Sequence, residues 1–575
     1  MNRLRLRVLA FLLLALTGGN LTTPVAAQPR PAPEAPEAPE APAAPGDPGP
    51  PSLGPRYSRP LAAPVSPVPV SRFPSAPAAV ADPGEPSVPP VLRPTPAIEL
   101  PSQSEVDPQA GFIKGDLARV GAIELRSDFD RVALHAGVQR IGREWLLTAT
   151  PRLDLKFLEK YVRLGLAVPL RTLLLDEAAA DLDRSGYRVK LRQEDWDEPG
   201  DYLKVLHQLT IGSKEEEFFL GLGQGQPVTL GHGTLVRRYS SNLDLDHTRT
   251  TVELDLYDRV LGMEAFIGDL ASPSVVGALL FIKPDGLLSP SLTDRPLKRL
   301  SLGLSLASDV SAPLALSSVS RDGAEYLAVD ETGNPLFREQ AVTGLGVDAE
   351  LKLVRTAHVD LKPYLDHSWL LNHGSGTTLG ALARFSVGSS PPFQAWRLRG
   401  ELRTFEADFL PGYFDALYEF QRYQYVTGQS PRQGFVPTKL AWLQEQVGGA
   451  RRFGYYVEAS WALVGWVALS AALEDSTAPF AKGLTLHAEI PANRFLTLFL
   501  TYHRRGEDSF AVPFDFEEDT EIFFWAVRLK ILPILAINYR SQRAFAVNRF
   551  AQANLDRLYD NVFHFAVDLE LGYEF

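Results

Sequence analysis

Cysteine is absent from the 575 residues of this chain. The absence excludes disulfide bonds, thiol nucleophiles and cysteine-bound metals together. Long hydrophobic runs are also missing, because beyond the first 30 residues no stretch approaches the roughly 20 apolar residues that a membrane-spanning helix needs. The net charge of −12 argues against nucleic acid as a partner.

Average hydrophobicity does not separate a soluble protein from a membrane β-barrel. The chain is 45% hydrophobic and 22% charged, which is ordinary for a soluble protein. A membrane barrel carries its apolar residues at alternate positions, so its average also looks soluble. The order of the residues therefore has to decide.

The N-terminal residues predict an exported protein. Three arginines precede a compact apolar core, VLAFLLLAL, and Val25-Ala26-Ala27 offers a small-residue cleavage site. We expect residues 1–27 to be a cleavable signal peptide. Residues 28–115 are rich in proline and alanine, and proline removes the backbone hydrogen bonds of helices and sheets, so we expect a disordered periplasmic linker there. This arm is either a solvated tether or a spacer that contacts the cell wall or a periplasmic partner.

From residue 116 onward the chain consists of short segments in which apolar and polar residues alternate. RLSLGLSLA, for example, sets four leucines against Ser301, Gly303 and Ser305, and this period of two is typical of strands. We count roughly 18 to 20 segments of about ten residues, the length that crosses a bilayer at a tilt. The connections LVGW and ILPI are tight, whereas those at 175–186, 308–336 and 408–452 are long. Short turns on one rim and long loops on the other are typical of a transmembrane barrel.

The last strand carries the most specific signal. Phe575, Tyr573, Leu571, Leu569 and Val567 alternate with small or polar residues up to the end of the sequence. This stretch resembles the carboxy-terminal signal of Gram-negative outer-membrane β-barrel proteins, which the barrel-assembly machinery recognises. The resemblance implies an outer-membrane location, surrounding lipid and the assembly machinery as partners.

The sequence thus predicts an all-β fold, a transmembrane antiparallel β-barrel of about 18 strands over residues 116–575. A barrel of this size is wide enough for an aqueous lumen unless loops fold into it. Its size resembles porins and export channels, which implies passive diffusion or export of polar or anionic solutes or of polysaccharide. The alternative is a non-conducting barrel for anchoring or adhesion whose lumen is closed by loops. The oligomeric state stays open.

Charged residues on the polar faces of three strands are the candidate lumen-lining groups. They are Arg397, Arg399, Glu401, Arg403, Glu253, Asp255, Arg528 and Lys530. A row of guanidinium groups in a pore would attract anions or acidic sugars. Alternatively, Glu401 and a facing strand with Glu253 and Asp255 neutralise the arginines, and the pairs only tie the wall together.

Three stretches do not fit a simple wall. Residues 228–243 alternate poorly, and this segment sits at a rim, forms a bulge or turns inward. The aromatic connection 408–452 either folds into the lumen, stacks on sugar rings or packs on the barrel mouth. Residues 111–142 are either the first two strands or a small plug ahead of the barrel.

We expect no enzyme and no cofactor. GLGQG at 221–225 has no helix after it, so we expect no phosphate-binding loop there. EDWDEPGD at 194–201 lacks the regular ligand spacing of a calcium loop. His232 in GHGT has no serine and acid at a spacing that would support hydrolysis.

Overall fold

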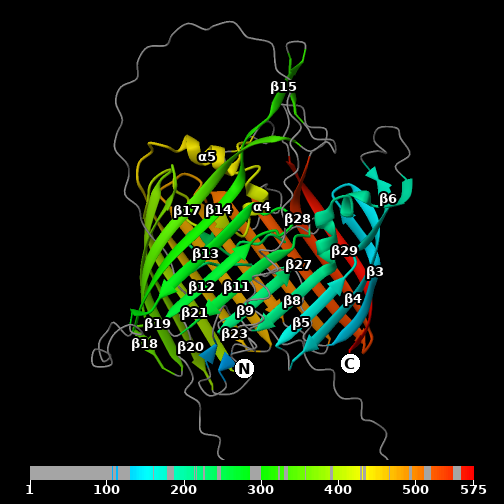
Figure 1. The fold of residues 1–575 in the computed structure, drawn as a ribbon, viewed down its shortest axis with the longest axis horizontal. Coiled ribbons are helices and arrows are strands. Elements are labelled where there is room, and N and C mark those ends of the chain that lie inside the picture. The colour runs from blue at the N-terminus through cyan, green and yellow to red at the C-terminus, as the bar shows by residue number, and fades with distance from the viewer. Residues whose placement is uncertain are drawn as a thin grey trace, which may run out of the picture. The chain divides into compact units, whose positions relative to one another are not determined.

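A computed structural model describes residues 106–107, 112–113 and, with internal gaps, 130–574, the longest gaps being 285–298, 510–519 and 548–558. The strands of this part form one closed antiparallel barrel (Figure 1). The barrel closes where β29 (Tyr559–Glu574) pairs with β3 (Arg131–Ile141). The predicted all-β barrel is confirmed. Its described part has 20 strands, slightly more than the predicted 18.

Some barrel strands are interrupted. Two segments, β5 (Val162–Ala167) and β6 (Leu170–Asp176), pair with the same neighbour, β4 (Glu144–Phe157). Pro169 lies between them and has no N–H to donate to a ladder, so the strand breaks there. The next strand is divided into β7 (Tyr187–Leu191) and β8 (Leu206–Gly212) by two short 3₁₀ turns.

The remaining wall strands follow in chain order. The first group is β9 (Phe218–Gly223), β11 (Thr251–Tyr257), β12 (Leu261–Ile267), β13 (Val275–Ile282), β14 (Leu300–Leu316), β17 (Phe337–Leu351), β18 (Val354–Arg355), β19 (Val359–Leu370) and β20 (Ser375–Val387). The second group is β21 (Gln394–Phe405), β23 (Arg452–Leu463), β24 (Val467–Ser476), β25 (Lys482–Ile490), β26 (Leu496–Glu507), β27 (Glu521–Leu532) and β28 (Leu535–Val547).

Smaller elements lie outside the wall. They are β1 (Val106–Asp107), β2 (Phe112–Ile113), η1 (Gln193–Asp195), η2 (Pro199–Val205), β10 (Val236–Arg237), β15 (Ser318–Arg321), β16 (Ala324–Leu327), β22 (Phe414–Asp415), α4 (Tyr418–Gln421) and α5 (Lys439–Glu445). β1 and β2 form a separate two-stranded sheet. Residues 111–142 therefore contain β2, which lies outside the wall, and then β3, the first wall strand. The predicted signal peptide, most of the predicted linker and Phe575 lie outside the described residues.

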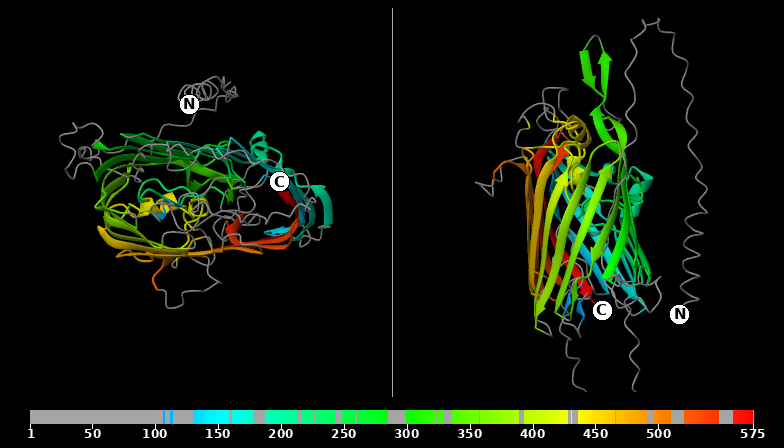
Figure 2. Two further views of the ribbon diagram at one scale, coloured as in Figure 1. Left: turned by 90° about the horizontal axis from the view of Figure 1, so that it is seen from below. Right: turned by 90° about the vertical axis from the view of Figure 1, so that its left-hand side faces the viewer.

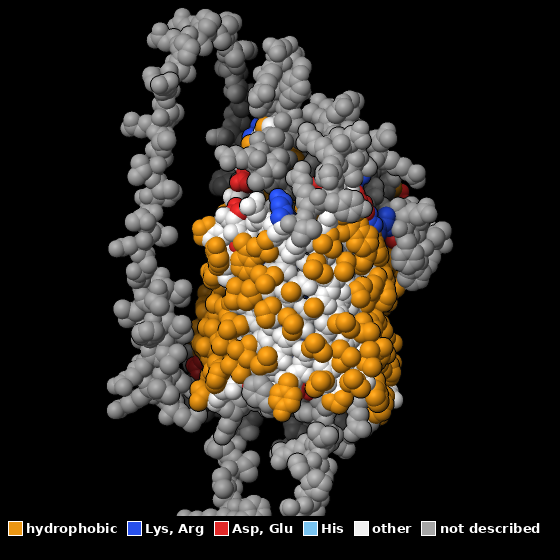
Figure 3. Space-filling model, turned by 90° about the vertical axis from the view of Figure 1, so that its right-hand side faces the viewer, with side chains coloured by type: hydrophobic (Ala, Val, Ile, Leu, Met, Phe, Trp, Pro, Cys, Tyr) orange, Lys and Arg blue, Asp and Glu red, His pale blue; other side chains and the backbone are white. Residues whose placement is uncertain are grey.

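Side chains alternate across the wall as the sequence predicts. On β29, Leu569, Leu571 and Tyr573 are more than half exposed on the outside, whereas Asp568 and Glu570 point inward and are buried. Figure 3 shows the outer surface covered by hydrophobic side chains along the strands, with charged groups near the upper rim. Such an apolar surface is suited to lipid. Closure of the barrel adds to this, because it leaves no unpaired strand edge in the bilayer.

Among the described residues, no helix is both long and apolar enough to cross a membrane.

Two connections on the same rim turn into the barrel. Residues 228–242, between β9 and β11, meet residues 406–426, between β21 and β23, through a parallel pairing of β10 with β22. We call these two segments the plug. The view along the barrel in Figure 2 (left) shows them inside the ring of strands. Of the three alternatives for 228–243, the inward turn is therefore correct, and the first part of 408–452 also folds into the lumen.

The plug packs on an apolar part of the inner wall. Phe414, Tyr418 and Val236 of the plug are fully buried in the same hydrophobic cluster as Leu279 and Leu370 of the wall. Other inward wall residues of this cluster are Phe266, Phe281, Val342, Tyr364, Leu382 and Phe405. This side of the lumen is therefore a packed core and not a water-lined surface.

Two wall glycines make room for plug side chains. A Cβ atom at Gly344 would lie 2.5 Å from Leu235, and one at Gly376 would lie 2.6 Å from Phe409. Glycine inside a strand commonly marks such a close approach. The wall is thus shaped to the plug as well as covered by it.

Candidate functional site

The lumen holds two polar regions, one between the plug and β21 and one on the opposite side of the barrel. The first contains the arginine row that the sequence singled out. The structure places Arg397, Arg399, Glu401 and Arg403 on the inner face of β21, where all four are at most 7% exposed. The plug covers them.

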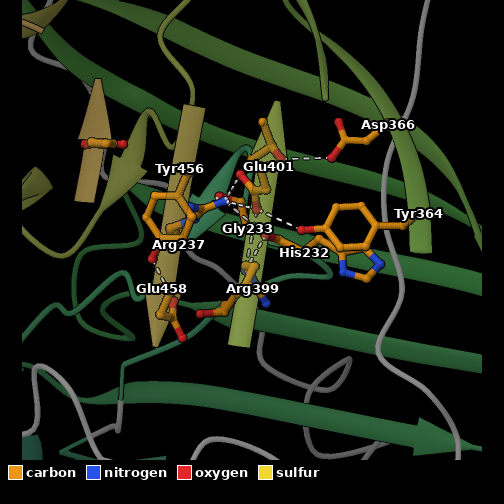
Figure 4. A network of polar contacts seen from close by, with 12 residues as sticks. His232, Gly233, Arg237, Tyr364, Asp366, Arg399, Glu401, Tyr456 and Glu458 are labelled. Carbon is orange, nitrogen blue, oxygen red and sulfur yellow. Dashed lines mark hydrogen bonds and ion pairs between the residues drawn. The ribbon is translucent and has the colours of Figure 1, made fainter. Parts of the chain in front are cut away.

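Ion pairs hold this row on both sides (Figure 4). Glu401 accepts hydrogen bonds from Arg237 of the plug at 2.8 Å and from Arg403 at 2.6 Å. Arg397 pairs with Glu458 of β23, and Arg399 donates to the backbone carbonyl of His232 at 2.7 Å.

Of the acids expected to neutralise the row, Glu401 does so, but those of β11 do not. Glu458 and Glu474 from β23 and β24 supply the counter-charges, whereas β11, which carries Glu253 and Asp255, is not a neighbour of β21. Glu253 pairs instead with Lys214, and both β11 acids line a small cavity against plug residues 228–230. The sequence identified the face and the partner Glu401 correctly, but not the acids of the facing strands.

More buried polar contacts fix the plug to the wall. Thr234 donates to Asp366 at 2.8 Å, and Tyr418 donates to Asp309 at 2.7 Å. His232 stacks on Tyr364 with ring centroids 3.8 Å apart. Burial lowers the pKa of His232 to about 4, so this ring is neutral at physiological pH.

A lysine anchors the second plug segment. Lys439 on α5 is fully buried, 3.3 Å from Asp415, and its ammonium lies 5.2 to 5.8 Å from the ring centroids of Tyr413, Tyr418 and Tyr425. Such a cage of aromatic faces stabilises a cation. Burial nevertheless lowers its pKa to about 8, against the opposing charge of Asp415.

The second polar region is a cavity away from the plug core. We call it the basic cavity. It is bounded by the inner faces of β3, β4, β27, β28 and β29 and by the strand break at Pro169. Its charged lining consists of Arg131, Arg152, Arg171, Lys204, Arg528, Arg540, Asp568 and Glu570. These described lining residues leave a formal excess of four positive charges, from six cations and two carboxylates.

The basic cavity extends along much of the wall. Arg131, His135 and Gln139 of β3 all line it, and eight residues of strand span roughly 27 Å. The remaining polar lining is Thr148, Thr150, His207, Gln224, Thr248 and Asn538, and no aromatic Phe, Tyr or Trp is among the described lining residues. The surface offers mainly hydrogen-bond donors and no stacking face for sugar rings.

Carboxylates partly satisfy the cations of this cavity. Arg152 lies 2.9 Å from Asp154, and Arg540 lies 3.4 Å from Asp568. Arg528 of the predicted lining set binds Glu570 through two hydrogen bonds of 2.8 and 2.9 Å, and Lys530 lies 3.3 Å from Glu574. The Nε of Arg131 and one Nη of Arg152 have no hydrogen-bond partner among the described residues.

Sequence reasoning missed most of this cavity. Arg152 does fall on the polar face of WLLTATPRLDLKF, so alternation could have marked it. Arg171 and Lys204 lie beside a strand break and in η2, where alternation fails. Among the described residues, no group of His, Asp and Glu is arranged to hold a metal ion.

Neither any known protein family nor any curated protein matches this chain in sequence. Among solved structures, OccK11 (OpdR) of Pseudomonas aeruginosa is 13% identical, with 80% of this chain and 100% of that chain covered and a TM-score of 0.27. Wzi of Escherichia coli, an outer-membrane protein described as a carbohydrate-binding β-barrel involved in group 1 capsule assembly, is 9% identical, with 78% and 85% covered and a TM-score of 0.28. OmpT of Vibrio cholerae, an outer membrane protein, is 8% identical, with 78% and 99% covered and a TM-score of 0.23. Similarity at this level assigns no function.

Proposed function

We propose that the protein is an outer-membrane channel that conducts small anionic solutes through the basic cavity. The observation that carries the proposal is the charged lining of that cavity, six cations and two carboxylates over much of the strand length, with Asp154, Asp195 and Asp201 outside the lining paired to Arg152, Arg171 and Lys204. Cationic side chains in a low-dielectric wall concentrate anions and exclude cations. The predicted export signal, the apolar outer surface and the alternating last strand support the outer membrane as its location.

The plug argues against a wide lumen. If the plug left the barrel, Phe266, Leu279 and Phe281 on the inner wall would face water, at a cost of about 25 cal/mol for each Å² of apolar surface. A conduit for a folded polysaccharide chain would need that space. We therefore assign transport to the cavity beside the plug and to solutes of small size.

A non-conducting anchor is the second candidate. The observation in its favour is the packed core between plug and wall, which closes one side of the lumen. An anchor, however, has no use for a row of cations along the opposite wall. Conduction distinguishes the two candidates directly.

The test is the current through purified, folded protein in a planar bilayer under a salt gradient. We expect small steps with an anion-selective reversal potential, and the double variant Arg152→Gln, Arg540→Gln should shift that potential toward zero. Arg451→Gln, at the exposed rim, is the matched control and should leave it unchanged. A folded protein without current, or with cation selectivity, would contradict the proposal.

A further inference from the structure

Glu570 has an unusual position among the groups of the basic cavity. It lies on the inner face of β29 and is 3% exposed. Two guanidinium groups and one amide converge on its carboxylate: Arg528 at 2.8 and 2.9 Å, Arg131 at 3.0 Å and Asn538 at 3.1 Å. No other carboxylate that lines this cavity has as many partners within 3.2 Å in the described part of the chain.

The backbone positions these donors rigidly. They come from β27, β28 and β3, which together with β29 are consecutive in the barrel. Arg528 lies opposite Asn538 in the register of β27 and β28, and Glu570 lies opposite His135 in the register of β29 and β3. A ladder of four strands therefore forms a binding position for one planar oxyanion, because guanidinium forks match a carboxylate or phosphate edge.

We propose that Glu570 is a specificity-determining residue of the channel, a tethered carboxylate that occupies its strongest anion-binding position. The inference rests on the proposed function and names its solute class, small oxyanions such as phosphates and carboxylates. A solute must bind well enough to enter and weakly enough to leave. With Glu570 in place, Arg131 and Arg528 are already paired. A passing oxyanion is therefore attracted to them but does not bind tightly.

Spare donors beside Glu570 give the passing oxyanion its contacts. The Nε of Arg131 and one Nη of Arg152 belong to side chains that line the cavity, and neither has a hydrogen-bond partner among the described residues. Both atoms are buried, so an oxyanion next to Glu570 contacts them when the Arg131 and Arg152 side chains turn toward it, without displacing the carboxylate. Chloride can also accept from several donors, but its spherical shape offers no planar edge that matches the guanidinium forks.

The test compares wild type and Glu570→Gln for block of a chloride current by inorganic phosphate. We expect half-block of the variant at a phosphate concentration roughly tenfold or more below that of wild type, because two charge-assisted donors become free to bind. Asp568→Asn, whose carboxylate forms a longer ion pair of 3.4 Å with Arg540, is the matched control with a smaller effect. Adding Arg528→Gln to Glu570→Gln should restore the sensitivity toward that of wild type.

Calorimetric titration of the detergent-folded proteins with phosphate separates this inference from the proposed function. Tighter binding by Glu570→Gln without any current would uphold the site and refute the channel. Equal binding by both proteins, or equal block in conducting channels, would overturn the role of Glu570. If Glu570→Gln does not fold, Glu570→Asp withdraws the carboxylate by one methylene and should raise phosphate affinity to an intermediate degree.

Discussion

Glu401 shows how single charged residues stabilise the lumen. Its carboxylate accepts from Arg237 and Arg403 and from the hydroxyl of Tyr364 at 2.9 Å, all inside the barrel. Buried ion pairs of this kind add little net stability when intact, but removal of one partner leaves charges that water cannot reach. The plug and the wall are therefore tied together at this residue.

Glu401→Gln should lower the free energy of unfolding by roughly 3–5 kcal/mol, because Arg237 and Arg403 lose their common acceptor. Urea unfolding followed by tryptophan fluorescence measures the change. Glu406→Gln, in a 3.9 Å pair at the exposed rim, is the control and should cost under about 1 kcal/mol. Equal effects of the two substitutions would refute the importance of burial here.

Lys439 makes plug stability depend on pH. Its folded pKa of about 8 lies below the ordinary value of 10.5, so between these two pH values the unfolded chain binds more protons and stability rises with pH. The charged groups facing it are Asp415, Arg505 and Glu474.

Wild-type stability should therefore increase by up to roughly 3 kcal/mol from pH 7 to pH 10.5 through this group. The tyrosines of the cage stay protonated in the folded protein because burial raises the pKa of each. In the unfolded chain they begin to ionise near the ordinary tyrosine pKa of about 10, and they oppose the increase at the upper end of the window. In Lys439→Met this part of the increase should vanish, as urea unfolding at a series of pH values would show. An unchanged pH profile would contradict a buried, partly discharged lysine.

At the residue scale the sequence predicted faces and the partner Glu401 within the same strand, but not the partners from other segments. Alternation placed Arg397, Arg399 and Arg403 on one side of a strand because that information is local. Their partners, Glu458 and Arg237, are fixed by the strand order and by an inward loop, neither of which alternation contains. For the same reason the sequence marked Glu570 only as a polar position in the last strand and did not show its partners.

At the level of elements, the wall was predictable and the plug was not. Each wall strand has its own period of two, whereas β10 and β22 pair across about 180 residues and are two residues long. The poor alternation of 228–243 was the local sign that this segment leaves the wall. Only the pairing of β10 with β22 shows that this segment turns inward.

Phe414→Ala tests whether the plug is a structural core. Phe414 is fully buried against Tyr413 and Tyr418, and truncation of such a ring costs roughly 3–5 kcal/mol. We expect a loss of this size in urea unfolding, with anion selectivity unchanged since the basic cavity lies elsewhere. Val447→Ala, exposed in the same connection, should have almost no effect. A stable Phe414→Ala protein with a much larger current would instead identify the plug as a removable gate.

At the scale of the whole molecule, net charge and local charge have opposite signs. The chain carries −12 overall, yet the described lining of the basic cavity has a positive excess of four. Composition cannot reveal this, because the plug decides which part of the inner wall stays open. The arginine row of β21 is covered by the plug, and the cavity beside β3 and β29 takes the place expected for that row.

If the protein conducts as proposed, the closed half of the lumen limits the size of the current. A barrel of 20 strands without a plug would leave a wide aqueous channel, whereas transport beside the plug leaves room only for small solutes. We expect neutral polymers to reduce the current only when they are small enough to enter the basic cavity, and larger polymers to leave it unchanged. Single-channel recordings with a graded series of polyethylene glycols measure this cutoff, and Arg451→Gln serves as the control for rim effects. Entry of polymers that need the full barrel width would show that the plug leaves the lumen, and would return a wide export conduit to consideration.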